Sequence, residues 1–441
     1  MHTMRSTLIA GFVVLLLVLG GCDLDIVNPN EPSEEEVLTT TEGIEALAVG
    51  MQEFYATTAL EPALLTTGVT TREVAVTTTF ANLLNLEAGG ANLPPSNANV
   101  LQLWSRNYRV VNMAEDIIDN TPDLPFEEDT ESGLVATAHL FKAMALGNIA
   151  QNFEQGVLFT SRTEPPPFVD RTEVFEEAIR LLENAEAILN ETPVSDDFTT
   201  SILAEGIDLE NTIAAYQARY HLFAGNYNEA LTAADAVDPA ATSTLPHDDD
   251  SRNPVAQAVQ NAESYAPREN LGLENPNPDD ARLDFFTTLP EDEDGPIESE
   301  NGLPVLALTG FFASPSDEIP LYVPGELDLI RAEALVRTGN LSEAVTAIDA
   351  VRTKSPAEDP FGLGADLDPY EGEETEAALL NEILQQRQIE LYLQGLRLED
   401  RRRLGADAPD PDDIFARSRN FYPYPNQERQ NNPNTPANPA I

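Results

Sequence analysis

The chain has very little positive charge and almost no cysteine, histidine or tryptophan. Lysine and arginine together number 24 against 76 aspartates and glutamates, which gives a net charge of −52. Such a charge excludes electrostatic binding to nucleic acid or to an anionic membrane surface. A single cysteine excludes a disulfide within the chain. The four histidines show neither an H-E-x-x-H motif nor a Cys/His spacing that would predict zinc, so no metal or cofactor is expected.

Sequence signatures of common enzyme classes are also missing. No G-x-S-x-G elbow, Walker loop or dinucleotide fingerprint occurs. A pair of glycosidase carboxylates can be neither recognised nor excluded from sequence. Two acidic runs, 247–250 and 292–295, suggest calcium, but the second lacks the alternating oxygens and the distal glutamate of an EF-hand loop. In so acidic a chain we interpret both runs as solvated surface.

The excess of acid has a consequence for folding. Self-repulsion destabilises a compact state in dilute salt, whereas at molar ionic strength the Debye length falls to about 3 Å. A disordered chain is the alternative, but 42% of the residues are hydrophobic and they recur at helical spacing. We therefore expect a folded, halophilic protein whose acidic surface is adapted to brine.

The longest apolar run lies at the N-terminus. Arg5 precedes the run Leu8–Leu19, which is too short to cross a hydrocarbon core that needs about 20 residues. This pattern predicts a signal peptide over 1–21. The L-G-G-C motif that ends at Cys22 resembles the lipobox of bacterial lipoproteins, so Cys22 is the predicted lipidation site. A secretory signal followed by a chance cysteine is the alternative.

Most of the remaining chain shows the pattern of amphipathic helices. Apolar stripes run along 100–118, 134–149 and 174–188, and Asp170 with Glu173 predicts a capping box at the start of the last. The fold class is therefore predicted to be all-α. Irregular insertions rich in proline, asparagine, aspartate and glycine are expected over 60–99, 239–325, 355–374 and 406–441.

Two later segments repeat one another. Segment 216–237 contains G-N-Y-N-E-A-L from Gly225, and segment 330–351 contains G-N-L-S-E-A-V from Gly339. In each, glycine is expected to end one helix at positive φ, and asparagine with the following glutamate is expected to cap the next. This is the helical hairpin of a tetratricopeptide repeat, but the copies lie 114 residues apart, where tandem repeats would lie about 34 apart. We expect helical hairpins separated by long insertions.

The order of these elements resembles the RagB/SusD family of nutrient-uptake outer-membrane lipoproteins. The most specific part is the helix from Gln386 to Arg403, which is similar to the family's E-R-x-x-E-L-x-x-E-G-x-R-x-x-D-L-R-R, with Gln386 and Gln394 in place of two glutamates. Its arginines are expected to form internal ion pairs. The other matching segments are Leu24–Pro29, Ser33–Val37, Trp104–Asn112, Leu134–Gly156, Pro165–Pro167, Thr172–Leu189, Glu326–Arg352, Tyr422–Pro425 and Asn432–Asn434.

The resemblance implies a non-enzymatic, surface-exposed lipoprotein of the outer membrane. Such a protein binds a glycan or another oligomeric nutrient and delivers it to a TonB-dependent transporter. It also implies an N-terminal helical region over 22–240 and a C-terminal region over 241–441 that contains the repeat unit 326–352. Two rivals remain open: a helical-repeat scaffold for an envelope assembly complex, and a lipoprotein glycoside hydrolase.

Candidate ligand contacts come from the insertions, because sugars stack on exposed aromatic rings flanked by polar side chains. The early insertion offers Arg72, Phe80 and Asn82. The middle insertion offers Tyr265, Arg268, Phe311 and Phe312. The alternative is that these side chains form the small cores of their own loops. Trp104, on a helical stripe, is expected to pack in the core. That the two insertions form one site is a hypothesis taken from the family's architecture.

Overall fold

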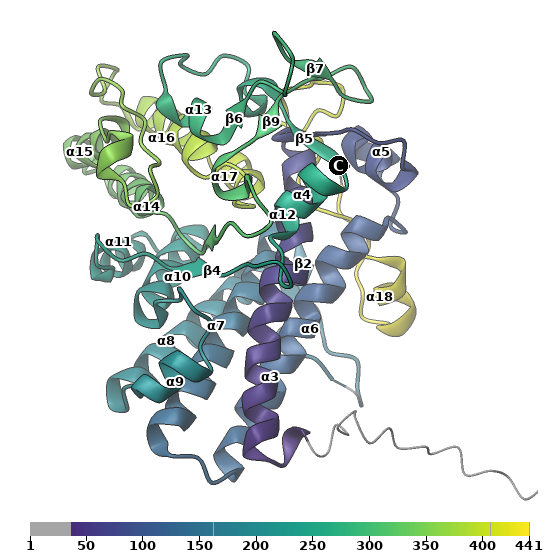
Figure 1. Ribbon diagram of the computed structural model, residues 1–441, viewed down its shortest axis with the longest axis vertical. Coiled ribbons are helices and arrows are strands. Elements are labelled where there is room, and N and C mark those ends of the chain that lie inside the picture. Colours follow the sequence, from purple (N-terminus) through teal and green to yellow (C-terminus); the bar gives the residue numbers. More distant parts are fainter. Residues whose placement is uncertain (1–36, 162, 406, 441) are drawn as a thin grey trace, which may run out of the picture.

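Helices dominate the part of the chain that the structure describes. The computed structural model describes residues 37–161, 163–405 and 407–440 (Figure 1). Within these residues the strands are two or three residues long and pair only as two-stranded sheets. The predicted all-α scaffold of helical hairpins is confirmed. The predicted signal peptide and Cys22 lie outside the described residues.

The N-terminal half is a layered bundle around one central helix. Its helices are α3 (Thr41–Phe54), α4 (Leu60–Thr70), α5 (Ala81–Ala88), α6 (Ala98–Asn120), α7 (Glu128–Asn152), α8 (Arg171–Glu191), α9 (Asp196–Ser201), α10 (Leu209–Ala224) and α11 (Tyr227–Ala236). Helix α7 packs between α6 and α8. Among the described helices α7 alone is long and apolar enough to span a membrane, but 89% of its apolar window is buried inside the protein, as in a core helix.

The C-terminal half carries further helices and all but three of the strands that the structure describes. The helices are α12 (Pro254–Ala256), α13 (Ala281–Phe286), α14 (Pro324–Arg337), α15 (Leu341–Arg352), α16 (Glu376–Glu390), α17 (Arg397–Arg403) and α18 (Asn426–Asn431). The antiparallel pairs are β1 (Val74–Val76) with β5 (Tyr265–Pro267), β2 (Gln155–Gly156) with β3 (Val169–Asp170), β4 (Thr244–Leu245) with β10 (Ile319–Pro320), β6 (Thr287–Thr288) with β9 (Ala307–Leu308), and β7 (Ile297–Glu298) with β8 (Pro304–Val305).

Short turns of 3-10 or π type complete the architecture. They are η1 (Tyr55–Ala59), η2 (Gly90–Asn92), η3 (Thr121–Asp123), η4 (Gln257–Asn261), η5 (Glu269–Gly272), η6 (Gly310–Phe312) and η7 (Pro356–Glu358). The main hydrophobic core runs from α3 to the C-terminal segment, so the predicted N-terminal and C-terminal regions share it.

The two repeated segments form the predicted helical hairpins, α10–α11 and α14–α15, which pack side by side although they are far apart in sequence (Figure 1). Gly225 and Gly339 follow the C-terminal end of the first helix of each hairpin and have φ of 84° and 86°, as predicted. The predicted asparagine caps are wrong in detail. Asn226 and Asn340 occupy the cap positions, but their side chains make no capping hydrogen bond.

Two other sequence expectations need correction. Asp170 lies at the start of α8, but its side chain makes no capping bond and accepts instead from the Gln155 side chain at 3.2 Å. The early insertion is shorter than predicted, because α4 occupies its first residues and α5 its middle. The last insertion was expected to be extended throughout. It contains the short helix α18, which begins directly after Pro425.

The predicted C-terminal helix is two helices, α16 and α17, joined by a turn in which Leu393 and Gly395 have positive φ. Three of the four arginines of α17 form internal ion pairs, as expected, whereas Arg401 donates to the Phe415 carbonyl. Arg397 lies 3.6 Å from Glu73, and Arg403 lies 2.8 Å from Asp400.

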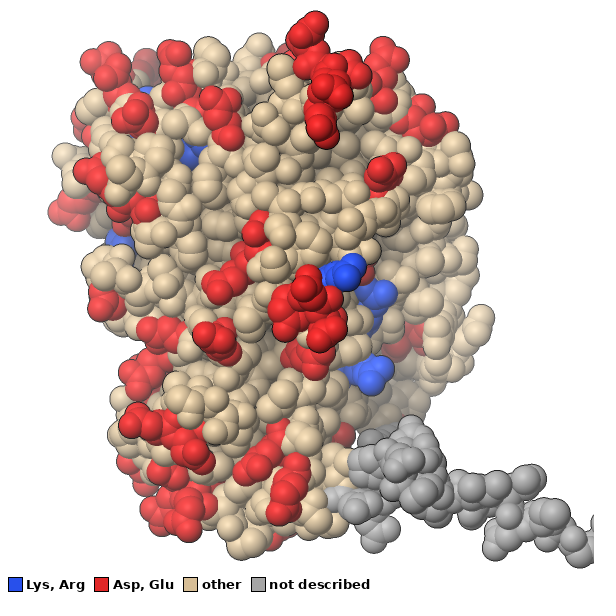
Figure 2. Space-filling model, viewed as in Figure 1, with Lys and Arg blue, Asp and Glu red and all other residues tan. Residues whose placement is uncertain are grey.

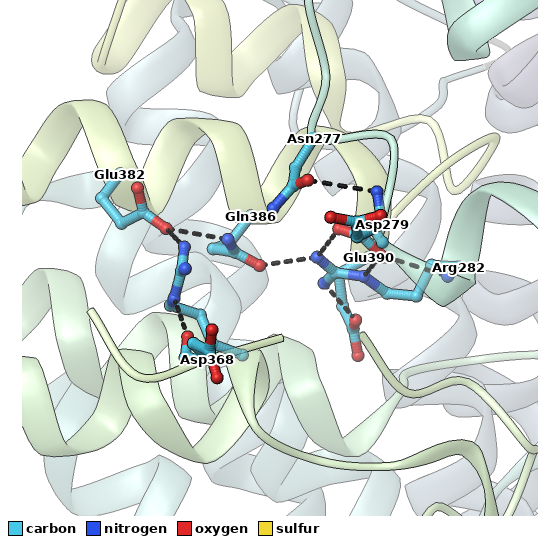
Figure 3. Close-up of polar contacts among 9 residues, drawn as sticks. Asn277, Asp279, Arg282, Asp368, Glu382, Gln386 and Glu390 are labelled. Atoms are coloured by element: carbon cyan, nitrogen blue, oxygen red, sulfur yellow. Dashed lines mark hydrogen bonds and ion pairs between the residues drawn. The ribbon is translucent and has the colours of Figure 1, made fainter. Parts of the chain in front are cut away.

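Gln386 on α16 shows how the fold accommodates an amide where the family pattern has a carboxylate. Its Oε1 accepts from Arg282 at 2.6 Å, and its Nε2 donates to Glu382 at 2.8 Å (Figure 3). Arg282 on α13 also pairs with Asp280 at 2.6 Å and Glu390 at 2.8 Å. A neutral amide therefore links two charged groups, and the network joins the middle insertion to α16.

Acidic side chains are spread over the surface, whereas many arginines are inside. Figure 2 shows Asp and Glu over most of one face with few Lys and Arg among them. The buried arginines are Arg72, Arg219, Arg268, Arg282, Arg387, Arg397, Arg417 and Arg419. Among the described residues ten Asp and Glu side chains are buried as well, so the burial of arginine hardly changes the net charge of the surface.

His139 is a titratable group buried in α7. Its exposed fraction is 9%, and burial, with Lys142 and Arg180 nearby, lowers its pKa to about 4. Because an unfolded histidine has a pKa of about 6.5, the stability from this neutral side chain is present above that pH and is lost as the pH falls toward the folded value. We expect His139→Gln to reduce the acid-induced loss of unfolding free energy by on the order of 2 kcal/mol. Urea unfolding at neutral and mildly acidic pH measures this, and equal losses in both proteins would refute the assignment.

Candidate ligand-binding site

The early and middle insertions meet at a short antiparallel ladder. Strand β1 pairs with β5 so that Val76 lies opposite Tyr265 and Val74 opposite Pro267. The backbone N–H of Arg268 donates to Glu73 O at 3.0 Å, which extends the contact beyond the ladder. Two segments nearly 200 residues apart in sequence therefore lie side by side.

A cavity of about 390 Å³ opens next to this ladder. Its walls come from α4, α5, α6, β5 and the α12–η4 turn. The lining residues are Thr57, Glu61, Pro62, Leu65, Thr66, Asn82, Leu83, Asn99, Gln102, Arg252, Pro254, Gln257, Ala258, Ala262, Ser264 and Tyr265. The lining thus combines amides, hydroxyls and small apolar groups with two charged side chains, Glu61 and Arg252.

Three side chains form a connected polar wall in this cavity. Asn82 Nδ2 donates to Asn99 Oδ1 at 2.8 Å, and Asn99 Nδ2 donates to the Tyr265 hydroxyl at 3.3 Å. Asn82 is also fixed from behind, because Asn97 Nδ2 donates to its backbone carbonyl at 2.7 Å. These contacts hold the amides in place before any ligand arrives, which lowers the entropic cost of binding.

The polar groups of the cavity are mostly neutral. Burial, with Glu61 nearby, raises the pKa of Tyr265, so its hydroxyl keeps its proton at physiological pH. Glu61 itself is paired with Arg106 at 2.8 Å. Such a surface has hydrogen-bond donors and acceptors for hydroxyl groups without a strong net field. The chemistry suits a neutral, hydroxyl-rich ligand.

Two of the predicted site residues, Asn82 and Tyr265, line the cavity. Phe80 does not, but it is 60% exposed at the start of α5, two residues before Asn82. Gln102 and Asn99, on α6, were missed by sequence reasoning. Asn99, Gln102 and Arg106 recur at helical spacing and form a polar face of α6. This polar face could have indicated Asn99 and Gln102 as candidates from the sequence.

The two predicted arginines are buried and bind the backbone of other segments. Arg72 donates to Glu87 O at 2.7 Å, Pro411 O at 2.9 Å and Ala416 O at 3.2 Å. Arg268, 2% exposed, donates to Ile414 O. Both guanidinium groups therefore hold the C-terminal segment against the insertions, and neither lines the cavity.

Phe311 and Phe312 were predicted as possible ligand contacts. In the structure they lie in a hydrophobic cluster instead. Phe312 is fully buried, and Phe311 packs against Phe285 at 5.2 Å and Phe361 at 5.6 Å between ring centroids. The two rings form the core of the middle insertion, which was the structural alternative. Trp104 is 3% exposed and packs in the main core, as expected.

Comparison with known proteins places this fold. The SusD family model matches residues 317–440. A SusD superfamily protein from Bacteroides thetaiotaomicron superposes with a TM-score of 0.68 at 17% identity, covering 91% of this chain and 100% of that one. A SusD/RagB family protein from the same species gives 0.67 at 16% identity, covering 89% and 94%. A SusD-like carbohydrate-binding protein from Bacteroides vulgatus gives 0.64 at 17% identity, covering 82% and 83%.

A search of curated protein sequences finds no significant match. The evidence for kinship is therefore the family signature at the C-terminal end and the shared fold, which extends over 91% of the chain in the superposition on the first of these structures. The order of the sequence motifs agrees with both. Residues 317–440 thus carry the signature of the SusD family, and the chain as a whole has the fold of SusD-like proteins.

Proposed function

We propose that the protein is a non-enzymatic surface lipoprotein of the outer membrane that binds an extracellular neutral glycan and delivers it to a TonB-dependent transporter. The observation that carries the proposal is the wall formed by Asn82, Asn99 and Tyr265 in the cavity where the two insertions meet. The SusD family signature over residues 317–440 and the likeness in fold to a SusD-like carbohydrate-binding protein support it.

The cavity has the chemistry that sugar binding requires. The Gln102 amide provides an acceptor and two donor hydrogens. The Asn82 amide, which donates one hydrogen to Asn99, keeps an acceptor and one donor hydrogen. Such groups match the adjacent hydroxyls of a pyranose. The apolar patches between them, such as Leu83 and Pro254, contact the C–H face of the ring. Phe80 offers an exposed ring on the adjacent surface for a further sugar unit.

The predicted lipid at Cys22 gives the proposal its location. Tethering at the outer membrane raises the effective concentration of the binding protein at its transporter. The acidic surface would keep the tethered body soluble in brine, where salt screens its self-repulsion. Because many arginines are buried, few positively charged side chains are exposed among the surface carboxylates.

We expect Asn82→Ala to weaken glycan binding by about tenfold, because it removes one hydrogen-bonding group and loosens the Asn99 amide. Affinity electrophoresis of the full chain in gels that contain neutral plant or algal polysaccharides, in molar KCl, measures retention. Asn228→Ala, an exposed asparagine on α11, is the matched control and should bind as the wild type does. Full retention of the Asn82 variant would rule out this cavity as the site.

Phe80→Ala tests the aromatic part of the proposal separately. Since Phe80 is already 60% exposed, its removal should leave the folded state intact. Unchanged retention of this variant would remove Phe80 from the site while leaving the cavity in place.

A further inference from the structure

A second cavity lies on another face of α6. Its volume is about 510 Å³, and it is bounded by α6, the segments 157–161 and 163–166, and α18. Leu101, Ser105 and Tyr108 line it, whereas Asn99 and Gln102 line the cavity between the insertions. Because successive helical residues are about 100° apart, one helix presents separate faces to the two cavities.

The aromatic wall of this cavity is held rigidly. Trp104 stacks on Phe168 at 5.7 Å and meets Tyr424 edge-on at 6.0 Å, and its indole N–H donates to Glu428 at 3.1 Å. The Tyr108 hydroxyl accepts from the Val157 N–H at 2.7 Å and donates to the Val157 carbonyl at 3.1 Å. Both rings therefore keep their orientation without a ligand.

One aromatic ring in this cavity is open to solvent. Phe159 is 44% exposed and lines the same cavity as Trp104 and Tyr108. The apolar face of this phenylalanine is in contact with water. Covering it with the apolar face of a ligand is therefore favourable. The wall thus offers a flat apolar surface of the kind on which a pyranose ring packs.

The other walls carry polar groups of both signs. Arg109 lies 4.6 Å from the Phe54 ring and has no ion-pair partner within the described chain. Glu164, Gln427 and Asn431 are exposed along the rim. Opposed charges and amides leave no strong net field for a charged ligand, whereas they provide donors and acceptors for hydroxyl groups.

We propose that this cavity is a second saccharide-binding site, which takes a neutral oligosaccharide on Phe159 and Tyr108 with its hydroxyls toward Arg109 and the α18 rim. The inference rests on the proposed function only for the class of ligand. Two sites on one helix would let a long glycan bind at two places on the same protein. Binding at both increases avidity without any new contact.

The chain carries its own reporter for this site, because Trp104 is the single tryptophan and it lines this cavity and not the one between the insertions. The experiment titrates the full chain, in molar KCl, with cellohexaose, maltohexaose, laminarihexaose, xylohexaose and mannohexaose while tryptophan fluorescence is recorded. We expect a saturable change with at least one of them. Phe159→Ala should weaken the affinity from that titration by about tenfold, the cost of losing one buried aromatic contact.

Two further variants separate this site from the first. Asn82→Ala should keep the fluorescence change while its retention on polysaccharide falls. Phe159→Ala should weaken the fluorescence titration, and its retention should fall less than that of Asn82→Ala, because the first site is intact. Leu289→Ala, an equally exposed apolar side chain in the middle insertion, is the control and should behave as the wild type. A flat titration with every oligosaccharide, or a response that Phe159→Ala leaves unchanged, would overturn the second site without touching the first.

Discussion

Replacing Arg282 with methionine is expected to lower the free energy of unfolding by about 3–5 kcal/mol, the usual cost of breaking a buried ion pair from one side. The Arg282 side chain is fully buried and pairs with Asp280. It also binds Glu390 and Gln386 (Figure 3). Methionine fills a similar volume but leaves two carboxylates in the interior without their cation. Burial already raises the pKa of Glu390, and the loss of Arg282 would add to that unfavourable burial of charge.

Urea unfolding at constant molar KCl measures the effect. The matched control is Arg180→Met, which removes an arginine whose side chain is 56% exposed and paired with Glu177 within one helix. Such a surface pair contributes about 0–1 kcal/mol. Equal losses in the two variants would contradict the view that the Arg282 network joins the middle insertion to α16.

Substitution of Gly272 by alanine is expected to cost about 2–5 kcal/mol and to weaken glycan retention. Gly272 has φ of 74°, and a Cβ there would lie 1.7 Å from the Arg72 carbonyl oxygen. The left-handed backbone costs about 1–2 kcal/mol for a residue with a side chain. The clash is with backbone, so the early insertion must move away from the middle one, which adds the cost of overpacking, about 1–3 kcal/mol. Because β1 and β5 meet here, the cavity should lose its shape.

Gly302→Ala is the control for this prediction. Gly302 lies in the same insertion with φ of 73°, but a Cβ there would meet nothing within 4 Å. It should therefore show the cost of the left-handed backbone without the loss of retention. If the two variants unfolded alike and bound alike, the close approach of the insertions would not matter for the site.

The sequence was sufficient for the helices and hairpins, because these depend on local periodicity. The stripe from Leu134 to Ile149 lies in α7, and Gly225 and Gly339 end their helices as expected. The caps at Asn226 and Asn340 were wrong, since competing local bonds decide the side-chain geometry. Asn226 is within 3.3 Å of His221, and Asn340 donates to Thr338.

The candidate site was harder to predict, because burial depends on contacts between distant segments. For an arginine or a phenylalanine in a proline-rich loop, the sequence does not show whether the side chain contacts a ligand or is buried in a core. Arg72 binds the backbone of Glu87, Pro411 and Ala416, the last two more than 330 residues away. The meeting of β1 with β5 could be expected only from the family resemblance, and it is what puts Asn82 near Tyr265.

The central claim is that the insertions meet to form a glycan site, and a crystal structure of the full chain with an oligosaccharide cut from a retained polysaccharide tests it most directly. The account predicts sugar in the cavity between α5, α6 and η4, with hydroxyls within hydrogen-bonding distance of Asn82 or Gln102. Sugar bound only at surfaces that contact neither insertion, with this cavity filled by water, would contradict it.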